Sequence, residues 1–599
     1  MVRTRGGLGL IAAAAAAATT LTLGAASTAA AGRVEISPQP GTQDASPGTQ
    51  ISIFGVPRRE IESVRVAGSV SGAHPGTLRT YSGDRGASFV LARPLTQGER
   101  VNVEIRIKGH IPIAFAFTVA ELLPNPPIIN IPATQPAKLQ HFVTAKALLP
   151  PKIAVHKTGP TVVEDLFLTP LPSPIVHPSA MNAISIKPVG PGGPMIIDRN
   201  GKLVWFHQLP RPIVASNFEI QRWNGKPVLT WWQGAVTIAA YGLGDGEIYD
   251  TSYRPLKVVH AGNGYSADVH EFVLTRSGDA LMTVQSLVNY HLPGTAPGKL
   301  SLLIDSIVQE IDVRTGLVVW EWHSLGHIPL SASFASPATS PYDDVFHVNS
   351  IEQVPGNRLL ISARDTCAIY EIDQATGRVL WTLGGMQSSF KMGPGTSFYF
   401  QHDARLEPGG RIGLFDDEGG PPFFAKSSRG LVLKLDTGRR TASLARQYPR
   451  PRTLADSEGS LQTLAGGDAL VGFGSEPDFT EFTSSGRMLF DASLPSDDGS
   501  YRVYGFRWAA TPRTRPAVTA RRTSPGHVSV YVSWNGANTV RRWQLLAGSS
   551  DGTLRPVAMV ADRAFETRIA LARSASRFEV RALGASGRVL ASSKPVGSS

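Results

Sequence analysis

The chain has 599 residues, 42% of them hydrophobic and 18% charged, which is too long for one ordinary core and predicts several folding units. Its 60 glycines, 45 prolines, 24 phenylalanines and 10 tryptophans favour a turn-rich, all-β protein, and the single cysteine, Cys367, excludes an intrachain disulfide and a thiolate metal site. The net charge is +11, but the 58 lysines and arginines are spread along the chain without a basic run, so we expect no nucleic-acid partner.

The first residues have the pattern of a secretion signal. Two arginines precede an apolar run from Leu8 to Leu23, and a stretch of small side chains ends at Ala31. The run covers about 16 residues, whereas a membrane-spanning helix needs about 20, so a retained membrane anchor is the weaker alternative. We therefore expect residues 1–31 to be cleaved near Ala31, and the mature chain to be secreted or extracytoplasmic without a transmembrane segment.

Two flanking segments alternate apolar and polar residues in short runs separated by turns, as in residues 101–107 and 528–534. This pattern predicts an N-terminal β-sandwich over residues 32–121 and a C-terminal, fibronectin-like β-sandwich over residues 513–599. Residues 122–176 carry repeated prolines, which favour an extended linker or a strap lying along a neighbouring domain.

The middle section, residues 177–512, repeats two hairpin motifs. One is an apolar strand, an aspartate, a turn ending in glycine and a strand with an aromatic residue, and its aspartates recur about every 60 residues. The other is a strand, a glycine turn and a returning strand, with turns at Gly225, Gly278, Gly356, Gly409 and Gly467. Two hairpins give four antiparallel strands per unit. About six units predict a six-bladed β-propeller closed by a strand near Tyr501, with seven blades as an open alternative.

Three histidines occupy the same position in three successive units. His270, His347 and His402 precede the turn glycines of their units by eight, nine and seven residues. Because the innermost strand of each blade runs along the central channel, a common position at its start places the three rings at one mouth of that channel. The alternative is three unrelated histidines, each satisfied within the core.

Arg364 and Asn349 complete the candidate site. Arg364 follows the turn of its hairpin by eight residues, so the returning strand brings it level with His347. Asn349 lies two residues after His347 and shares its face of the strand. The same reasoning brings weaker candidates to this end of the repeat: Asn217, Gln285, Asp416 or Asp417, Glu458 and Ser475.

The residue types point to an anion. Three neutral histidines with an open position would also suit Zn²⁺ or Fe²⁺, but the guanidinium of Arg364 is repelled by a metal cation and is a preferred partner of an oxyanion. Phosphoryl transfer would normally add Mg²⁺ with a carboxylate set, or a glycine-rich phosphate cradle, and neither has a clear pattern in the sequence. A monoanionic sulfuryl group needs less charge compensation and can pass through a histidine nitrogen.

Four sequence blocks surround these residues: 268–272, 345–350 with 361–364, 379–385 and 400–404. Together they resemble the bacterial arylsulfotransferases (aryl-sulfate sulfotransferases), over about residues 180–510. The resemblance implies a six-bladed propeller that moves a sulfuryl group from a phenolic sulfate ester to a phenolic acceptor. It implies no nucleotide sulfate donor, and we expect no metal and no cofactor.

By the same resemblance, His402 is the nucleophile that becomes a sulfohistidine, while His270, His347, Asn349 and Arg364 bind the sulfuryl group and handle protons. His270 is the candidate acid for the leaving phenolate, and ping-pong kinetics follow from the covalent intermediate. Aromatic residues near the mouth are candidates for stacking on the aryl rings: Trp231, Trp232, Phe398 and Tyr399.

Two other classes of function remain open from the sequence. A ligand-binding or scaffold protein would hold a molecule at the propeller mouth without turning it over. A metalloenzyme with histidine ligands would contain metal and lose its activity with a chelator. The sequence does not specify the physiological donor, the acceptor or the oligomeric state.

Overall fold

The computed structural model describes residues 34–130, 136–160, 165–172, 190–291, 300–334, 343–420, 423–572 and 575–598. The signal predicted for residues 1–31 lies outside the described residues. The described chain consists of strands and loops without an α-helix, which confirms the all-β class. Five short 3-10 segments interrupt it: η1 (Arg58–Glu60), η2 (Ser82–Asp84), η3 (Pro136–Lys138), η4 (Leu330–Ala332) and η5 (Asp551–Thr553). In the same residues, no helix is long and apolar enough to span a membrane.

The N-terminal part contains two antiparallel sheets that share one hydrophobic core. Strand β7 shows why: Val101, Val103, Ile105 and Ile107 are buried, and the residues between them are more exposed. One sheet has the order β1 (Glu35–Ser37), β2 (Ile51–Phe54), β6 (Gly86–Leu91) and β5 (Gly76–Thr80). The other has the order β4 (Gly72–His74), β3 (Ile61–Gly68), β7 (Arg100–Ile107) and β8 (Ile113–Thr118).

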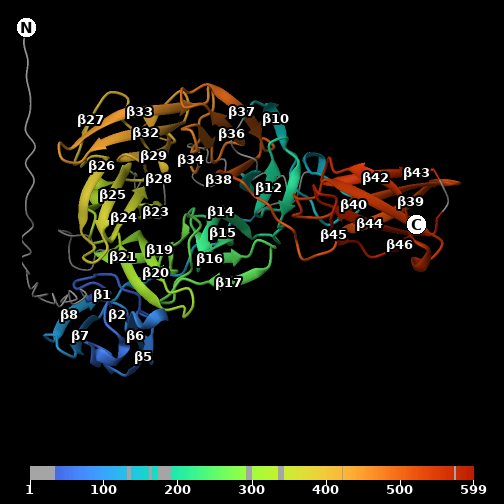
Figure 1. Ribbon diagram of the computed structural model, residues 1–599. Helices are drawn as coiled ribbons and strands as arrows, with labels where there is room; N and C mark the ends of the chain where they lie inside the picture. Colours follow the sequence, from blue (N-terminus) through green and yellow to red (C-terminus); the bar gives the residue numbers. More distant parts are fainter. Residues whose placement is uncertain are drawn as a thin grey trace, which may run out of the picture.

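Six sheets make up the middle of the chain and follow one another around a common centre (Figure 1). The first contains β38 (Asp498–Phe506), β11 (Asp165–Pro172), β12 (Met195–Asp198) and β13 (Leu203–Phe206). The second contains β14 (Val214–Trp223), β15 (Lys226–Val236), β16 (Gly242–Tyr249) and β17 (Pro255–Val259). The third contains β18 (Phe272–Leu274), β19 (Ala280–His291), β20 (Leu300–Ile311) and β21 (Val318–His323), with β9 (Glu121–Leu122) on β19 and β22 (Asp343–Asp344) on β20.

The remaining three sheets continue the series. The fourth contains β23 (Val348–Val354), β24 (Arg358–Ala363), β25 (Ala368–Asp373) and β26 (Val379–Gly384). The fifth contains β28 (His402–Glu407), β29 (Arg411–Asp416), β32 (Arg429–Asp436), β33 (Thr441–Pro449) and β27 (Lys391–Met392). The sixth contains β34 (Ser460–Thr463), β35 (Ala469–Gly472), β36 (Asp478–Phe482), β37 (Met488–Ser493) and β10 (Ala154–Lys157). A small hairpin of β30 (Gly419–Gly420) and β31 (Phe423–Phe424) follows β29.

The first strands of these sheets contact one another in a closed circuit. β14 contacts β18, β23 contacts β28, β28 contacts β34, β34 contacts β38 and β38 contacts β14, while β19 links the third sheet to β23. The glycine turns predicted from the sequence lie between the first two strands of five sheets. Two of them, Gly278 and Gly409, have φ of +89° and +83°, a conformation that glycine adopts without the steric cost of a Cβ.

The proline-rich segment 122–176 is more than a linker. Its strand β11 lies between β38 and β12, so the two ends of the middle section meet in one sheet. Leu166 and Leu168 are buried there, and the register shifts between Leu168 and Pro170, where proline has no N–H to give to the ladder. Upstream, the segment lies along the second and third sheets, because the amide of Leu123 donates to the carbonyl of Leu287 at 2.9 Å.

The C-terminal part again has two sheets around one core. One is β39 (Ala517–Ser524), β40 (His527–Ser533) and β43 (Glu566–Leu571). The other is β42 (Arg555–Ala561), β41 (Arg542–Gly548), β44 (Arg577–Leu583) and β45 (Val589–Ser592), with β46 (Val596–Gly597) on β44. In Figure 1 this pair lies beside β12, and the N-terminal pair lies below the third sheet.

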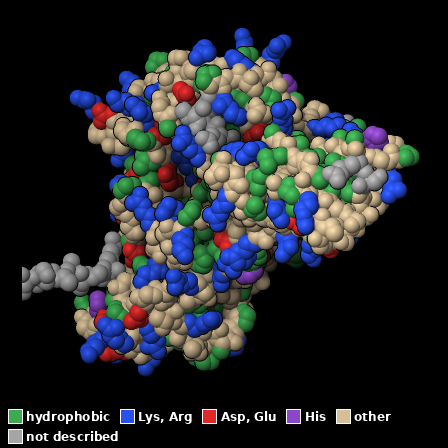
Figure 2. Space-filling view, turned by 45° about the vertical axis from the view of Figure 1, so that its right-hand side comes forward, with side chains coloured by type: hydrophobic (Ala, Val, Ile, Leu, Met, Phe, Trp, Pro, Cys, Tyr) green, Lys and Arg blue, Asp and Glu red, His purple; other side chains and the backbone are tan. Residues whose placement is uncertain are grey.

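Lysine and arginine side chains are scattered over all parts of the face shown in Figure 2, with carboxylates between them.

Candidate functional site

The five candidate residues lie near the same ends of neighbouring strands. His270 precedes β18, His347 precedes β23, Asn349 belongs to β23, Arg364 follows β24 and His402 opens β28. The three histidines are 4%, 8% and 2% exposed, and Asn349 is fully buried, while the side chain of Arg364 keeps 24% of its surface. A group this deeply withdrawn from water needs partners for each of its polar atoms.

His270 and His347 form a pair. Their Nε2 atoms lie 2.9 Å apart, and the rings meet edge to face. On the far side of each ring, Nδ1 contacts a carboxylate: Asp268 for His270, and Asp344, at 2.6 Å, for His347. Burial opposes the charging of both rings. It lowers the pKa of His270, whereas the carboxylate of Asp344 outweighs it and raises the pKa of His347. The opposite directions of the two pKa shifts favour His347 as the donor and His270 as the acceptor of the hydrogen between the Nε2 atoms.

His402 has the opposite character. Its Nδ1 lies 2.9 Å from Oδ2 of Asp417, and the main-chain N–H of Glu458 lies 3.3 Å from its Nε2. Because that N–H donates to Nε2, the ring carries its proton on Nδ1, and Asp417 accepts it as a carboxylate. Burial and the positive charge of Arg364 hold the pKa of His402 well below its usual value. His402 is thus a neutral imidazole with a lone pair on Nε2.

The charge of Asp417 depends on the same neighbours. Burial raises the pKa of its carboxyl group, and the cationic charge of Arg364 opposes that rise. The contact between Glu458 and His402 decides in favour of the ionised form, because a protonated Asp417 would have to donate to Nδ1 and leave a hydrogen on Nε2.

Arg364 lies beside His347, as the hairpin register predicts. Its amide donates to the carbonyl oxygen of His347 at 2.9 Å. Its guanidinium donates to Asp365 at 2.7 Å and to the carbonyl of Asp456 at 3.3 Å, and it lies 4.8 Å from the centre of the Phe400 ring. The result is a partly exposed cation next to two buried histidines, which favours an anionic ligand.

Asn349 contacts the His402 segment directly. Its Nδ2 donates to the carbonyl of Gln401 at 2.7 Å, and its Oδ1 is buried and has no hydrogen-bond partner among the residues that the structure describes. This contact holds the residue before His402 against β23. Tyr501 of β38 packs its ring edge-on against both His270 and His402, at 5.7 and 6.3 Å between ring centres. The closing strand therefore separates the two kinds of histidine.

Sequence reasoning missed a buried ion network beneath the histidines. Glu271 contacts Arg405 at 2.7 Å and Arg502 at 2.8 Å, and Asp403 contacts Arg405 at 2.8 Å. The sequence carries one sign of this network: Glu271 and Asp403 directly follow His270 and His402 in the chain. Carboxylates that follow His270 and His402, paired with Arg405 of β28 and Arg502 of β38, fix the backbone that carries these two rings.

Glu458 is the most informative of the weaker candidates. Its Oε2 is buried and has no hydrogen-bond partner in the described chain, and burial raises the pKa of its carboxyl group to about 8. This direction favours the protonated acid near neutral pH, in a residue whose main-chain N–H contacts Nε2 of His402. Of the pair Asp416 and Asp417, it is Asp417 that contacts His402, whereas Asp416 is bonded to Arg429 and Gln285 to Ser306.

The aromatic candidates divide into two groups. Trp231 and Trp232 are fully buried core residues, and Phe398 is 2% exposed, so these three are not available to a ligand. Tyr399 is partly exposed and stacks on Phe423, with 3.7 Å between ring centres.

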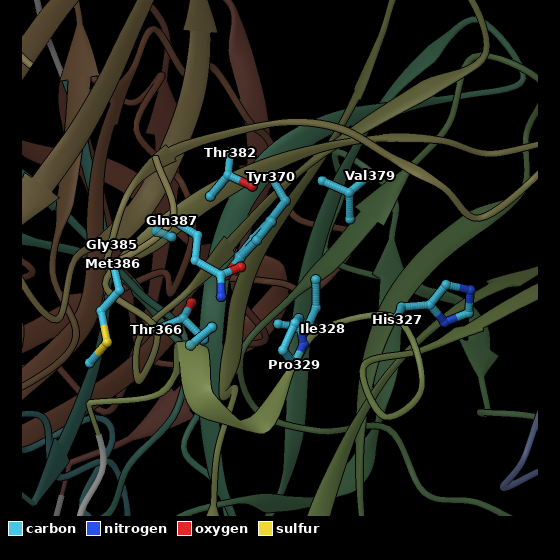
Figure 3. Close-up of a pocket in the computed structure, with 12 residues that line it drawn as sticks. His327, Ile328, Pro329, Thr366, Tyr370, Val379, Thr382, Gly385, Met386 and Gln387 are labelled. Atoms are coloured by element: carbon cyan, nitrogen blue, oxygen red, sulfur yellow. The ribbon is translucent and has the colours of Figure 1, made fainter. Parts of the chain in front are cut away.

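Figure 3 shows a cavity of about 150 Å³ near the fourth sheet, lined by residues that include His327, Tyr370, Met386 and Gln387. None of the five candidate residues lines it, although Thr366 in its wall follows Arg364 by two positions. The cavity is thus next to the histidine cluster rather than part of it.

The three histidines do not form a compact ligand set. Within the described ranges, groups of three histidine or carboxylate atoms within 4.8 Å of one another occur at Asp44, Asp305 and His323, and at Asp344, His347 and Asp365. Neither group joins His402 to His270 and His347. The geometry therefore favours an anion site over a three-histidine metal site.

A model of the arylsulfotransferase (ASST) family matches residues 219–494, a stretch that contains all five candidate residues and their carboxylate partners. This match supports membership of the arylsulfotransferase family. The arylsulfotransferase resemblance of the sequence blocks is thereby confirmed, and sulfotransferase chemistry on phenolic substrates is the activity that this family suggests. No curated protein matches the chain.

Several solved structures align with the chain at low similarity. A protein of unknown function from Bacteroides caccae covers 58% of this chain and 99% of its own, at 12% identity and a TM-score of 0.32. A protein of unknown function from Dyadobacter fermentans covers 61% and 96%, at 9% identity and a TM-score of 0.31. A GH43 protein from Bacillus licheniformis covers 64% and 88%, at 8% identity and a TM-score of 0.25. Similarity at this level carries no argument about the arylsulfotransferase domain.

Proposed function

We propose that this protein transfers a sulfuryl group from a phenolic sulfate ester to a phenolic acceptor through a sulfohistidine at His402. The observation that carries the proposal is the state of that ring. Its Nδ1 hydrogen is held by Asp417 at 2.9 Å, its pKa is lowered, and Arg364 lies close by. A neutral imidazole with an oriented lone pair beside a cation is what nucleophilic attack on a sulfate ester requires.

The proposed scaffold is a six-bladed β-propeller of residues 177–512, extended by β11, with a β-sandwich on either side at residues 32–121 and 513–599. Six sheets, a closed circuit of contacts between their first strands, and the pairing of β38 with β11 support it. We further propose that residues 1–31 direct the chain out of the cytoplasm.

In the first half-reaction, the lone pair of His402 Nε2 forms a bond to sulfur, and the bond from sulfur to the phenolic oxygen breaks with its electron pair on that oxygen. Negative charge on the sulfuryl oxygens faces Arg364 and the imidazolium of His347. Once Nε2 is bonded to sulfur, it no longer accepts a hydrogen bond from the main-chain N–H of Glu458, which lies 3.3 Å away in the free protein. That N–H then donates to a sulfuryl oxygen. In the second half-reaction an acceptor phenol gives its proton back to the His270–His347 pair, its oxygen bonds to sulfur, and the bond from sulfur to Nε2 breaks with its electron pair on nitrogen, which restores the neutral imidazole.

The leaving phenolate has a pKa of about 10 and benefits from a proton donor. Two groups hold a proton near His402. His347 donates its Nε2 hydrogen towards His270, and Glu458 is a buried neutral acid. We assign the proton to the His270–His347 pair, with His347 as the resting holder and His270 as its partner, because its carboxylates at Asp268 and Asp344 support the charge that moves.

A cluster of aromatic side chains lies beside Arg364 and could pack against an aryl ring. Phe423 lies between Tyr399, stacked at 3.7 Å between ring centres, and Phe334, edge-on at 5.2 Å. Phe400, under the guanidinium of Arg364, lies 6.2 Å from Phe423. We propose that this cluster contacts the phenolic ring of donor or acceptor, because offset aromatic packing is favourable and adapts to different rings.

The test uses the mature protein, an aryl sulfate labelled in its sulfur, and no acceptor. After quenching, we expect acid-labile label on the peptide that contains His402, and discharge of that label by added phenol without a nucleotide or metal. Label on the peptide of His270 or His347 would place the nucleophile elsewhere. Binding of the ester without release of phenol would favour a ligand-binding protein, and turnover that needs added Zn²⁺ or Fe²⁺ would favour a metalloenzyme.

A further inference from the structure

A second cluster of ionisable side chains shares no residue with the histidine site described above and lies where the N-terminal pair of sheets meets the third sheet. Its members are Asp44, Asp305 of β20, and Glu321 and His323 of β21, which are 3%, 0%, 2% and 2% exposed. Asp44 belongs to the N-terminal part and directly precedes Ala45, which bridges to Val119 of the same part. The cluster therefore joins the N-terminal part to the third sheet.

Three of its members are fully partnered. Nδ1 of His323 lies 2.6 Å from Oδ2 of Asp305, and its Nε2 lies 3.1 Å from Oε1 of Glu321. The other oxygen of Asp305 accepts from the hydroxyl of Ser324 at 3.1 Å, and the other oxygen of Glu321 accepts from Nδ2 of Asn263 at 2.9 Å. These contacts satisfy the ring of His323 from both sides.

Asp44 is the exception. Both of its carboxylate oxygens are buried and have no hydrogen-bond partner among the described residues. The nearest cationic atom is Nδ1 of His323, at 3.4 Å, and its single hydrogen is already donated to Asp305. Three buried carboxylates thus surround one imidazole. An ionised carboxylate in such a place is costly unless a proton or a cation neutralises it.

We propose that Asp44, Asp305 and His323 bind a divalent transition-metal ion, Zn²⁺ or Mn²⁺, which fastens the N-terminal pair of sheets to the third sheet. Their ligand atoms lie within 4.8 Å of one another. Two carboxylate oxygens and one imidazole nitrogen form a mixed set that suits these ions better than Ca²⁺ or Mg²⁺. Binding replaces the Nδ1 hydrogen of His323, and that proton leaves to solvent.

The surroundings of His323 support a ligand role. Its Nε2 faces Glu321, so a metal on Nδ1 would complete the arrangement of carboxylate, histidine and metal that orients many protein ligands. Glu321 is in turn fixed by Asn263 and Gln309. Nothing in this site depends on the sulfuryl-transfer reaction, because none of its residues belongs to the His402 cluster.

The experiment measures bound metal and thermal unfolding in the mature full-length protein, after dialysis against Zn²⁺ or Mn²⁺ and removal of free ions. We expect about one tightly bound ion per chain in the wild type and less than about one tenth of that in Asp44→Asn. A chelator should lower Tm in the wild type and leave it unchanged in Asp44→Asn. The same substitution leaves the carboxylates of Asp305 and Glu321 in place, so the variant should fold.

Two control variants keep the result unambiguous. Asp279→Asn removes the bidentate ion pair with Arg85, at 2.6 Å, in the same interface, and should lower Tm while the metal stays bound. Asp344→Asn alters the other close group of ligand atoms and should also keep the metal. A wild-type protein without stoichiometric metal, together with equal or higher Tm in Asp44→Asn, would show that a proton neutralises Asp44 and would overturn the proposal. Metal lost only in Asp344→Asn would overturn it as well.

Discussion

Replacing Asp417 by asparagine tests the state of the proposed nucleophile most directly. The substitution keeps the size of the side chain and removes the negative charge from the atom that lies 2.9 Å from Nδ1 of His402. Two orientations of the new amide are possible, and both impair the reaction. If its NH₂ faces Nδ1, the ring must carry its hydrogen on Nε2, and the lone pair that attacks sulfur is lost.

The magnitude follows from the charge that develops on the ring. When Nε2 of His402 bonds to sulfur, the imidazole becomes cationic while its Nδ1–H keeps donating to the carboxylate of Asp417. Two unit charges about 4 Å apart interact by about 4 kcal/mol at an effective dielectric constant of about 20, which corresponds to about 10³ in rate. If the amide instead imposes the wrong tautomer, the loss rises to about 10⁴, as in hydrolases whose histidine loses its aspartate.

The assay is the initial rate of phenol release from an aryl sulfate at saturating acceptor, for Asp417→Asn and for a neighbouring control. In Asp416→Asn the lost carboxylate pairs with Arg429 at 2.9 Å and does not contact His402, so the rate should stay within about threefold. A rate for Asp417→Asn within threefold of the wild type, in a protein with unchanged Tm, would refute the role assigned to this pair.

Three further predictions follow from the structure. Arg364→Lys keeps the charge but loses the planar fork, so kcat/KM for an aryl sulfate should fall by about 10- to 100-fold without vanishing, and an unchanged value would argue against a contact with the sulfuryl group. Asp344→Asn removes the carboxylate that raises the pKa of His347, so the decline of kcat/KM at alkaline pH should begin at lower pH. If this decline begins at the same pH as in the wild type, another group donates the proton. Burial raises the pKa of Glu310 to about 8, so its carboxyl group contributes stability at low pH that is lost as pH rises from about 4.5 to 8. Glu310→Gln, whose amide can donate to the Oε1 atom of Gln374, which has no partner within the described ranges, should therefore raise the unfolding free energy at pH 9 by about 1 to 3 kcal/mol, with little gain at pH 5.

The local features of the repeat were predictable because they depend on residues close together in the chain. A hairpin turn needs a residue that tolerates positive φ, and glycine at 278 and 409 supplies it at the expected places. The strand period of two then puts His347 opposite Arg364, which their backbone hydrogen bond of 2.9 Å confirms. Relationships of this kind can be counted along the sequence.

Features that depend on distant segments could not be counted in this way. Strand β11 carries two prolines, which argue against a central strand, yet Phe167 of β11 pairs with Tyr504 of the closing strand. Likewise Asp344 reaches Nδ1 of His347 from β22, outside the position that made the histidines visible, whereas the hairpin register did bring Asp416 or Asp417 to this end of the repeat. The sequence therefore concealed Asp344, and it left open whether Asp416 or Asp417 would face a histidine.

Those carboxylates explain how one set of three histidines can serve two purposes. A carboxylate on Nδ1 fixes the ring and leaves Nε2 to face the centre, and this holds for His270, His347 and His402 alike. A metal site would need a lone pair on all three Nε2 atoms within reach of one ion. Instead, two of these atoms share a proton across 2.9 Å, and the third is set apart beyond the ring of Tyr501, close to the charge of Arg364. Proton donor and nucleophile are thereby separated, and a group transfer through a covalent intermediate needs that division between them.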